Sequence, residues 1–554
     1  MRRENGKRQA EEDKLGWLVL AGVLLTSFFI ILRPVASAQG SASVVYHAKA
    51  VHTVSGETFR PGSLLVKDGL ILDVGPAKPA HDVQVVNWRD LEIFPALISP
   101  TSSLGLAEIS ALRPTRDFSE VGEFTPDVEA WTAVNPDSEL IPVARANGIG
   151  HALVAPMGGA VSGVSGLVKL DGWGVEAMTI KRHVALHLWW PGLSLDTSSK
   201  KKPLEEQAEN RKKLLAKIEE FFDDAEAYAQ AKEAGGGDFD VVPAWEAMLP
   251  FLSGKKQKPV MVHADELRQI KAAVAWAKRR KLRIILAGAK DAWQAADLLA
   301  EEKVPVIFQH VFTSPARDFD PHDVHFRAPG LLVNAGVKLA IGMRLGSWTA
   351  ADQRNLPYHA AHVVPYGLSR KDALAAITLR PAEMLGVADQ LGSLEKGKEA
   401  TFLAATEDLL DPRTQVRHLI LAGKKSSLES RHVKLHRLYS QRPGPGLQHM
   451  QAGAVPLSTP KAAVLEAHAD AKAPLPPHRL QHGHRPAVLE AHAEGNLTLN
   501  GKAVKRAVLP DALRDLAPNR LLIRAHRDLP YAKVLDLMSI AKQTGVNDFK
   551  LATD

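Results

Sequence analysis

Short apolar runs alternate with amphipathic runs in the middle of the chain, and this alternation constrains the fold more than any other sequence feature. The apolar runs fit strands and the amphipathic runs fit helices. In chain order they are KPVMVHADE (258–266), LRQIKAAVAWAKRRK (267–281), LRIILAGA (282–289), DAWQAADLLAEEK (291–303), VPVIFQHV (304–311) and VKLAIGM (337–343). Strands that alternate with helices at this spacing form parallel βαβ units. The sequence therefore predicts an α/β fold, and eight such units would close a barrel.

The composition is that of a globular protein with more than one domain. The chain has 554 residues, of which 45% are hydrophobic and 24% charged, enough to bury a sizeable core. The absence of cysteine excludes disulfides, thiolate metal sites and a cysteine nucleophile. The formal net charge of +7 is mild and no dense basic stripe with interleaved aromatics accompanies it, so no nucleic-acid partner is predicted.

The N-terminal 40 residues have the form of an export signal. A basic, polar segment precedes the unbroken apolar run LGWLVLAGVLLTSFFIIL (15–32), and RPVASAQG follows with Ala36 and Ala38 spaced as in a cleavage site. The run is also long enough to span a bilayer as a helix, with its basic end left in the cytoplasm. We expect residues 1–40 to be a signal peptide or an N-terminal membrane anchor. The rest of the chain is then exported and periplasmic, either released or held at the inner membrane.

Composition shifts divide the remainder into segments. Short strand patterns with Gly breaks occupy residues 43–93 and return at 387–430, on either side of the alternating region, which we place at 94–386. Residues 441–495 are rich in Pro, Gly, Gln and His, which is typical of a flexible linker. Residues 496–554 then form a small end module.

The linker contains a short internal duplication. AVLEAHA occurs at 463–469 and again at 487–493, and two copies are too few for a repeat architecture. In the end module, RLLIRAHRD, YAKVLDLMSIAKQTG and VNDFKLAT predict a strand, a helix and a strand, with Gly545 at the helix end. This β-α-β unit predicts a small α+β domain.

The region 43–440 resembles the amidohydrolase superfamily, in particular a divergent exported branch of its imidazolonepropionase-like members. FPALIS, DQLGSLEKGKEATFLA and AAITLRPAEMLGVAD match characteristic segments of that superfamily. The resemblance implies a distorted (β/α)8 TIM barrel with a small composite β-sandwich built from both flanks, 43–93 and 387–430. It also implies a metal-dependent hydrolase of C–N bonds of the non-peptide, cyclic amide type, with Zn or another divalent metal as cofactor.

The resemblance further implies a set of metal ligands at the strand ends, and this chain departs from it. The family carries a His-x-His pair on strand one, where this sequence has Thr101 and Ser103, and an Asp on strand eight, where it has Arg344. Hydroxyls replace imidazole poorly at a zinc site, and a fixed positive charge opposes cation binding. These three positions are therefore predicted to be lost ligand positions.

Strands five to seven supply the remaining candidates. His263 stands where the family has its strand-five ligand, whereas strand six offers only Ala287–Ala289 for its histidine. His263 is thus the one metal-ligand candidate in register, although a lone histidine at a strand end is more often structural. Asp265 and His310, which follow the neighbouring strand ends, are further candidates for a catalytic role.

The end module 496–554 is similar to the periplasmic domain of ExbD/TolR-type proteins. The similarity lies in LIRAHRDLPYAKVLDLMSIAKQTGVNDFKLATD. It implies an inner-membrane energy-transducing partner for this module. Proton transport by the chain itself is not predicted, because the apolar run 15–32 contains no titratable residue.

Two functions remain open from the sequence. The first is an exported amidohydrolase-family hydrolase of C–N bonds that has lost most of its metal ligands and could be a pseudoenzyme. The second is a non-catalytic periplasmic binding or scaffold protein, which docks through its tail on an envelope transport complex. Both place a small-molecule ligand in the barrel mouth, because a fold does not fix a function.

Overall fold

The computed structural model divides the chain into two units, Met1–Leu447 and Gln448–Asp554. The residues that the structure describes are 43–77, 83–197, 202–235, 240–252, 254, 257–441, 487–492, 496–516, 521–526, 531–544 and 549–553. The expected signal or anchor segment lies outside these residues, as does most of the expected linker. Within the described part of the chain, no helix has the length and apolar character needed to cross a membrane.

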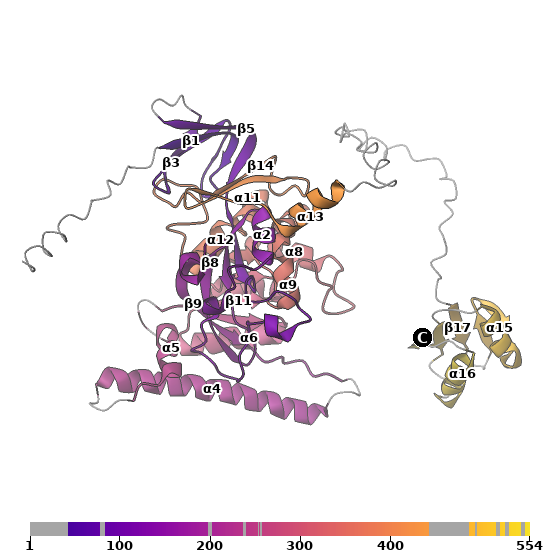
Figure 1. The fold of residues 1–554 in the computed structure, drawn as a ribbon. Coiled ribbons are helices and arrows are strands. Elements are labelled where there is room, and N and C mark those ends of the chain that lie inside the picture. The colour runs from indigo at the N-terminus through magenta and orange to yellow at the C-terminus, as the bar shows by residue number, and fades with distance from the viewer. Residues whose placement is uncertain are drawn as a thin grey trace, which may run out of the picture. The chain divides into compact units, whose positions relative to one another are not determined.

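A nearly closed sheet of eight strands forms the barrel, as the alternating pattern predicted (Figure 1). In chain order and in sheet order these are β6 (Leu97–Ser102), β7 (Ile149–Val154), β8 (Val161–Lys169), β9 (Thr179–Trp189), β10 (Val260–Ala264), β11 (Ile284–Gly288), β12 (Val306–Phe308) and β13 (Leu339–Ile341). The segment 376–377 bridges the two edge strands, since its carbonyls accept from the amides of Ile98 and Ile341. β8 runs antiparallel to both neighbours, and the other strands share one direction.

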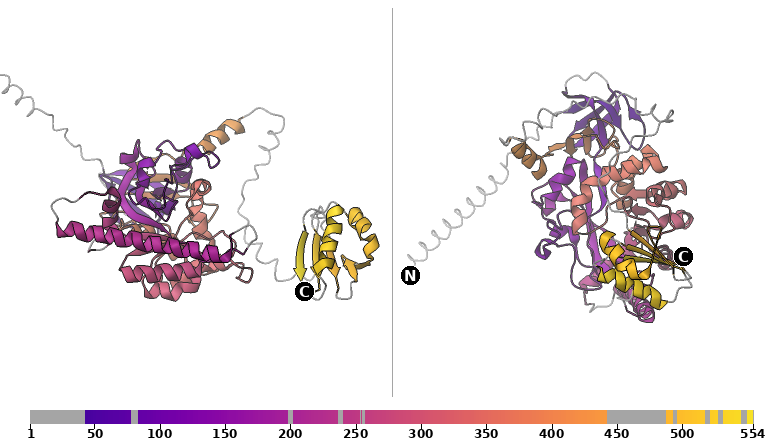
Figure 2. Two further views of the ribbon diagram at one scale, coloured as in Figure 1. Left: turned by 90° about the horizontal axis from the view of Figure 1, so that it is seen from below. Right: turned by 90° about the vertical axis from the view of Figure 1, so that its right-hand side faces the viewer.

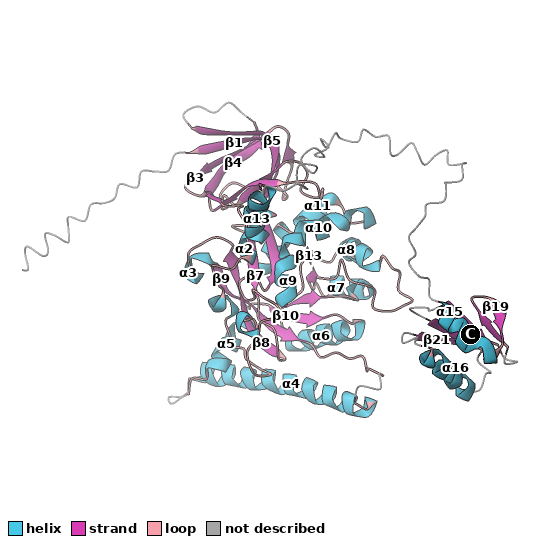
Figure 3. Ribbon diagram, turned by 45° about the vertical axis from the view of Figure 1, so that its right-hand side comes forward, coloured by secondary structure: helices cyan, strands magenta, loops and turns pink. Residues whose placement is uncertain are grey.

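Helices connect and surround these strands (Figure 3). They are α2 (Leu140–Ala146), α3 (Val175–Met178), α4 (Leu204–Ala234), α5 (Pro243–Leu252), α6 (Leu267–Arg280), α7 (Ala296–Glu301), α8 (Val324–Asn334), α9 (Ser347–Asp352), α10 (Leu356–His362), α11 (Arg370–Ala375), α12 (Leu379–Leu385) and α13 (Arg431–Ser440). α6 shows how the sequence sets such boundaries. Glu266 and Gln269 form a capping box at its start, and Lys281 ends it in a left-handed conformation.

The barrel has two hydrophobic layers. The inner one fills the barrel with apolar side chains that alternate along the strands, including Ile98, Leu153, Met261 and Ile307, and α12 contributes Met384 and Leu385 to it. The outer layer packs the helices against the opposite strand faces. Burying one such side chain contributes roughly 1.5–3 kcal/mol, so this packing dominates the stability of the barrel and fixes the direction of the strand ends.

Both flanks of the barrel region contribute to a second sheet. β1 to β5 come from the N-terminal flank and β14 to β16 from the C-terminal one, in the continuous order β16-β15-β14-β5-β1-β3-β4, with β2 paired to β1. The strands are β1 (Val44–His52), β2 (Thr58–Phe59), β3 (Gly62–Lys67), β4 (Leu70–Pro76), β5 (Gln84–Pro95), β14 (Phe402–Ala405), β15 (Val416–Leu421) and β16 (Lys424–Ser426). This sheet and α4 lie at opposite ends of the first unit (Figure 1).

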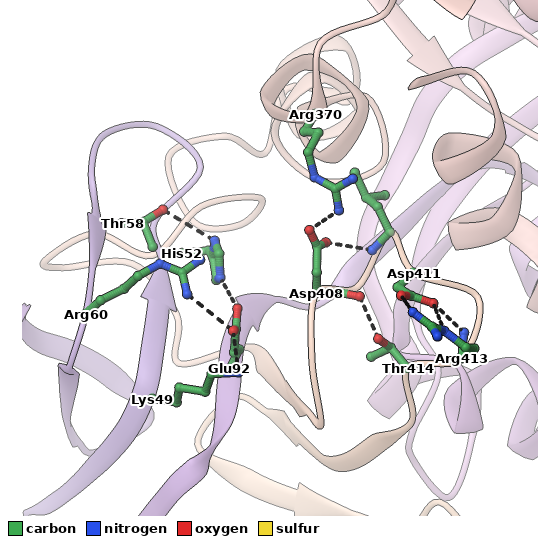
Figure 4. Close-up of polar contacts among 11 residues, drawn as sticks. Lys49, His52, Thr58, Arg60, Glu92, Arg370, Asp408, Asp411, Arg413 and Thr414 are labelled. Carbon is green, nitrogen blue, oxygen red and sulfur yellow. Dashed lines mark hydrogen bonds and ion pairs between the residues drawn. The ribbon is translucent and has the colours of Figure 1, made fainter. Parts of the chain in front are cut away.

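A buried carboxylate anchors the second sheet. Glu92 is 4% exposed, and it accepts from His52 at 2.7 Å and from Arg60 at 3.3 Å, with Lys49 also at 3.3 Å (Figure 4). Burial raises the pKa of Glu92, but these partners outweigh burial and hold the pKa below its usual value. The carboxylate therefore stays ionised and links two strands, β1 and β5, and the segment after β2.

The described part of the second unit contains a five-stranded sheet and two helices (Figure 2). Its elements are β17 (Ala487–Ala491), β18 (Leu497–Leu499), β19 (Lys502–Val504), α15 (Leu509–Leu516), β20 (Leu521–Ala525), α16 (Tyr531–Gln543) and β21 (Phe549–Thr553), in the sheet order β19-β18-β17-β20-β21. β17 lies inside the range expected to be linker. It is the second AVLEAHA copy, and its alternate residues Ala487, Leu489 and Ala491 are buried in the core of this unit.

Candidate active site

A cavity of about 550 Å³ opens at the carboxyl ends of the barrel strands. Trp189, His263 and Gly288 line it from β9, β10 and β11, while Gln309 and Arg344 line it just beyond β12 and β13. The carboxyl end of the strands is where enzymes with this barrel place their active sites, because the loops that follow the strands meet there. We call this cavity the mouth.

The two hydroxyls at the end of strand one are engaged in structural hydrogen bonds. Thr101 and Ser103 are both fully buried. The Thr101 hydroxyl donates to the carbonyl of Met343 at 2.7 Å and accepts from the Gln309 amide at 2.8 Å. The Ser103 hydroxyl accepts from the backbone N–H of Gly346 at 3.1 Å. These positions therefore tie the first barrel strand to the segment after the last one.

His263 is paired with a second histidine that the sequence analysis missed. His187 Nδ1 and His263 Nε2 lie 2.9 Å apart, so one ring donates its N–H to the other, and His263 stacks on Trp189 with 3.9 Å between ring centroids. Burial lowers the pKa of His263 to about 3 and the pKa of His187 well below its usual value. Both rings are therefore neutral. The alternation in VALHLWW, which puts His187 and Trp189 on one strand face, was the available signal.

The structure brings Asp265 and His310 together. His310 Nε2 donates to Asp265 Oδ1 at 2.8 Å, and the other ring nitrogen lies 3.2 Å from the Thr313 hydroxyl. Burial raises the pKa of Asp265, but the bond from His310 and the backbone N–H of Lys290 outweigh burial, so the pKa lies below its usual value. Asp265 lines the mouth with half of its side chain exposed, whereas His310 stands behind it, almost fully buried.

Gly288 explains why strand six offers no side chain at its end. Its φ is +87°, and an added Cβ would lie 2.4 Å from Asp265 Oδ1. A larger residue would thus displace the carboxylate. Glu266, which follows Asp265, accepts instead from the backbone N–H and hydroxyl of Ser194, at 3.0 and 2.6 Å, and caps α6. It serves the fold and points away from the pair formed by Asp265 and His310.

Arg344 brings a positive charge into the mouth. It is exposed, and it forms no ion pair with any residue that the structure describes. Arginine stays charged at every physiological pH. The mouth therefore holds one fixed cation, Arg344, and one ionised carboxylate, Asp265, between aromatic side chains that include Trp189 and Trp348.

The residues of the mouth do not fit the divalent metal that the resemblance implies. Within the described ranges, no three or more His, Cys, Asp or Glu side chains gather in a group that could hold a metal ion. The hydroxyls of Thr101 and Ser103 are consumed by structural bonds, His263 faces His187, and Arg344 repels a cation.

The fold and the cavity define a TIM-barrel protein with its site at the carboxyl ends of the strands. Residues 174–425 match the model of the Amidohydrolase family. No curated protein sequence matches the chain. The family match ends at residue 425 and leaves the second unit uncovered.

A solved structure of an amidohydrolase shares this fold. An amidohydrolase from Thermotoga maritima MSB8 superposes with a TM-score of 0.61 at 22% identity, over 69% of this chain and 99% of that chain. A molinate hydrolase is also similar, with a TM-score of 0.42 at 13% identity, over 74% of this chain and 99% of that chain. So is a Xaa-Pro dipeptidase with bound methionine, with a TM-score of 0.41 at 13% identity, over 70% of this chain and 100% of that chain. At 22% identity, the likeness to the Thermotoga protein establishes the fold and no more.

Proposed function

We propose that the barrel binds a small amide-like molecule in its mouth and hydrolyses a C–N bond of that molecule without the divalent metal of the family. The observation that carries the proposal is Asp265, an ionised carboxylate that lines a cavity of about 550 Å³ at the catalytic end of an amidohydrolase barrel. The class of reaction comes from the family match. A side chain, and not a metal, activates the water in this proposal, because the family's ligand positions hold Thr101, Ser103 and Arg344.

The proposed chemistry uses Asp265 as the general base. The carboxylate takes a proton from a water molecule while the water oxygen bonds to the carbonyl carbon. The proton then passes to the leaving nitrogen as the C–N bond breaks, giving a carboxylic acid and an amine. His310 acts as a positioning residue, because its N–H fixes one carboxylate oxygen and leaves the other to face the water.

Turnover by chelator-treated protein tests this proposal. Release of ammonia or amine from small linear and cyclic amides should survive removal of divalent ions and fall by about 10²–10⁴-fold in Asp265→Asn. Asp297→Asn, an exposed carboxylate on α7, is the matched control and should change nothing. Activity that requires an added metal would contradict the proposal. Binding of these amides without turnover would instead favour the non-catalytic binding or scaffold role.

We also propose that the chain is exported and that the apolar run 15–32 either directs export or anchors the chain in the inner membrane. The basic segment before the run and the small residues Ala36 and Ala38 after it support this location. N-terminal sequencing of the protein from fractionated cells distinguishes a chain that starts after Ala38 from an intact anchor. Full-length protein in the soluble cytoplasmic fraction would contradict both forms.

We further propose that the second unit docks on an inner-membrane energy-transducing complex. The support is the resemblance of residues 496–554 to ExbD/TolR-type domains and the β-α-β order of β20, α16 and β21. Because the sheet of this unit begins at β17, the deletion that tests the proposal should remove residues 487–554. A membrane partner that co-purifies with the full chain should be lost on this deletion, and equal recovery with both chains would argue against docking.

A further inference from the structure

A second, smaller cavity adjoins the mouth. It has a volume of about 250 Å³ and shares three lining residues with the mouth: Gln309, Arg344 and Thr349. Its other lining residues come from α9, α10 and the turn between them, and from the segments that follow β12 and β13. We call it the side pocket. The two cavities are therefore neighbours, with Arg344 on the boundary between them.

Three polar side chains that line the side pocket, Arg344, Asp352 and Asn355, have no partner among the described residues. Asp352 and Arg344 carry its two charges, one of each sign, and neither forms an ion pair with a described residue. Asn355 adds a side-chain amide that makes no hydrogen bond within the described part of the chain. Polar side chains in a protein cavity are usually satisfied by protein or by a ligand, so this set is available to a ligand.

His359 adds a buried polar group to the same wall. It is 8% exposed, and its Nδ1 is buried and meets no hydrogen-bonding partner among the described residues. Burial, together with the neighbouring His362, lowers the pKa of His359 to about 4, so the ring is neutral near pH 7. Phe312 holds the ring edge-on, with 4.6 Å between centroids. His359 therefore adds a neutral aromatic ring to this wall and no charge.

The opposite charges of Arg344 and Asp352 select the ligand class. A purely anionic group would gain from Arg344 but meet repulsion from Asp352, and a purely cationic group would meet the reverse. A group that carries both charges close together gains from both residues. Arginine also suits a carboxylate in particular, because its planar guanidinium donates two parallel hydrogen bonds.

We propose that the side pocket holds the zwitterionic head of an amino acid, with the α-carboxylate on Arg344 and the α-ammonium on Asp352. This inference rests on the proposed function and deepens it, because it makes the substrate class an amino acid that carries its amide in the side chain. The head group sits in the side pocket and the amide extends into the mouth toward Asp265. Asn355 adds a hydrogen bond to the head group, and the neutral ring of His359 packs beside it.

Calorimetric titration with three matched probes tests the inference. L-Glutamine carries both charges and a side-chain amide, N-acetyl-L-glutamine lacks the ammonium, and L-glutamine methyl ester lacks the carboxylate. The full chain with Asp265→Asn is titrated so that no probe is consumed. We expect glutamine to bind and each blocked probe to bind at least about tenfold more weakly, which corresponds to about 1.4 kcal/mol.

Variants assign each charge to its partner. Asp352→Asn should weaken the binding of glutamine by about tenfold and leave the binding of the N-acetyl probe unchanged. Arg344→Gln should weaken the binding of glutamine and leave the binding of the methyl ester unchanged. Asp318→Asn, an exposed carboxylate outside both cavities, is the control and should bind all three probes as the parent does.

Three results would overturn the inference. They are equal binding of glutamine and N-acetylglutamine, equal weakening of both by Asp352→Asn, and no binding of glutamine at millimolar concentration. Because the titration measures binding and not turnover, it tests this inference even if the protein hydrolyses no amide. Conversely, turnover of amides that lack the zwitterion would uphold the proposed function and overturn this inference alone.

Discussion

At the scale of the residue, Gly288 leaves the space that the carboxylate of Asp265 occupies. In Gly288→Ala the new Cβ would lie 2.4 Å from Asp265 Oδ1, at a φ of +87° that alanine rarely adopts. We expect a loss of about 1–3 kcal/mol in the free energy of unfolding and a fall in turnover. Urea denaturation measures the first effect. Gly192→Ala, where a Cβ meets nothing within 4 Å, is the control, and equal effects of both variants would contradict this role.

His151 makes the barrel sensitive to acid. It is fully buried, neither ring nitrogen meets a described partner, and burial lowers its pKa to about 3 from an ordinary 6.5. Between these values the unfolded chain binds a proton that the folded chain does not, so this contribution falls as pH drops below 6.5. The free energy of unfolding is thereby lowered by about 2 kcal/mol at pH 5.

The variant His151→Leu removes this titration. Its unfolding free energy should depend less on pH, by about 2 kcal/mol between pH 7 and pH 5. Denaturant unfolding at the two pH values measures the difference. The same substitution at His322, which is exposed, controls for the loss of an imidazole. A pH dependence identical to that of the parent chain would show that His151 does not stay neutral in the folded barrel.

The sequence could locate the ends of the barrel strands but not the contacts between them. The strand patterns predicted where the strands end, and the resemblance to the amidohydrolase superfamily singled out Thr101, His263 and Arg344 at those ends. The pairing of His263 with His187 and of Asp265 with His310 joins residues far apart in the chain. Spacing carries no information about such pairs, and Asp352 lies on a short helix without a distinctive pattern.

At the scale of the element, one arginine joins α4 to α6. Arg280 is buried against α4 and bonds to three of its acidic side chains, Glu219, Asp223 and Glu226, at 2.6, 2.6 and 3.2 Å. Arg280→Gln should cost about 1 kcal/mol and speed amide hydrogen exchange in α4, because three ion pairs to partly exposed carboxylates are lost together. Arg279→Gln, which removes a mostly exposed guanidinium, is the control. Unchanged exchange in α4 would contradict this anchoring role.

The antiparallel direction of strand β8 is a feature that the sequence pattern did not predict. Its sequence VSGVSGLVK has no helix before or after it that is long enough to return the chain for a parallel pairing. The strand is held instead by close contact, since a Cβ on Gly166 would lie 2.7 Å from the Trp131 ring. Gly166 leaves room for the ring of Trp131, which is distant in the sequence. The sequence alone does not distinguish such a glycine from one that is needed for a turn.

At the scale of the whole molecule, each unit has a hydrophobic core of its own. The second unit buries Leu489, Leu509, Leu513 and Ile523 among its own elements. We therefore expect deletion of residues 487–554 to leave the thermal unfolding of the barrel unchanged, as measured by calorimetry. A lower melting temperature of the barrel after this deletion would show that the two units stabilise each other.

Zinc analysis of the purified full chain tests the central claim, that the mouth works without the family's metal. We expect far less than one zinc or other divalent ion per chain, and a content that does not change in His263→Ala. Stoichiometric zinc that is lost in His263→Ala would contradict a metal-free mouth, because it would show that this histidine leaves His187 to bind a metal.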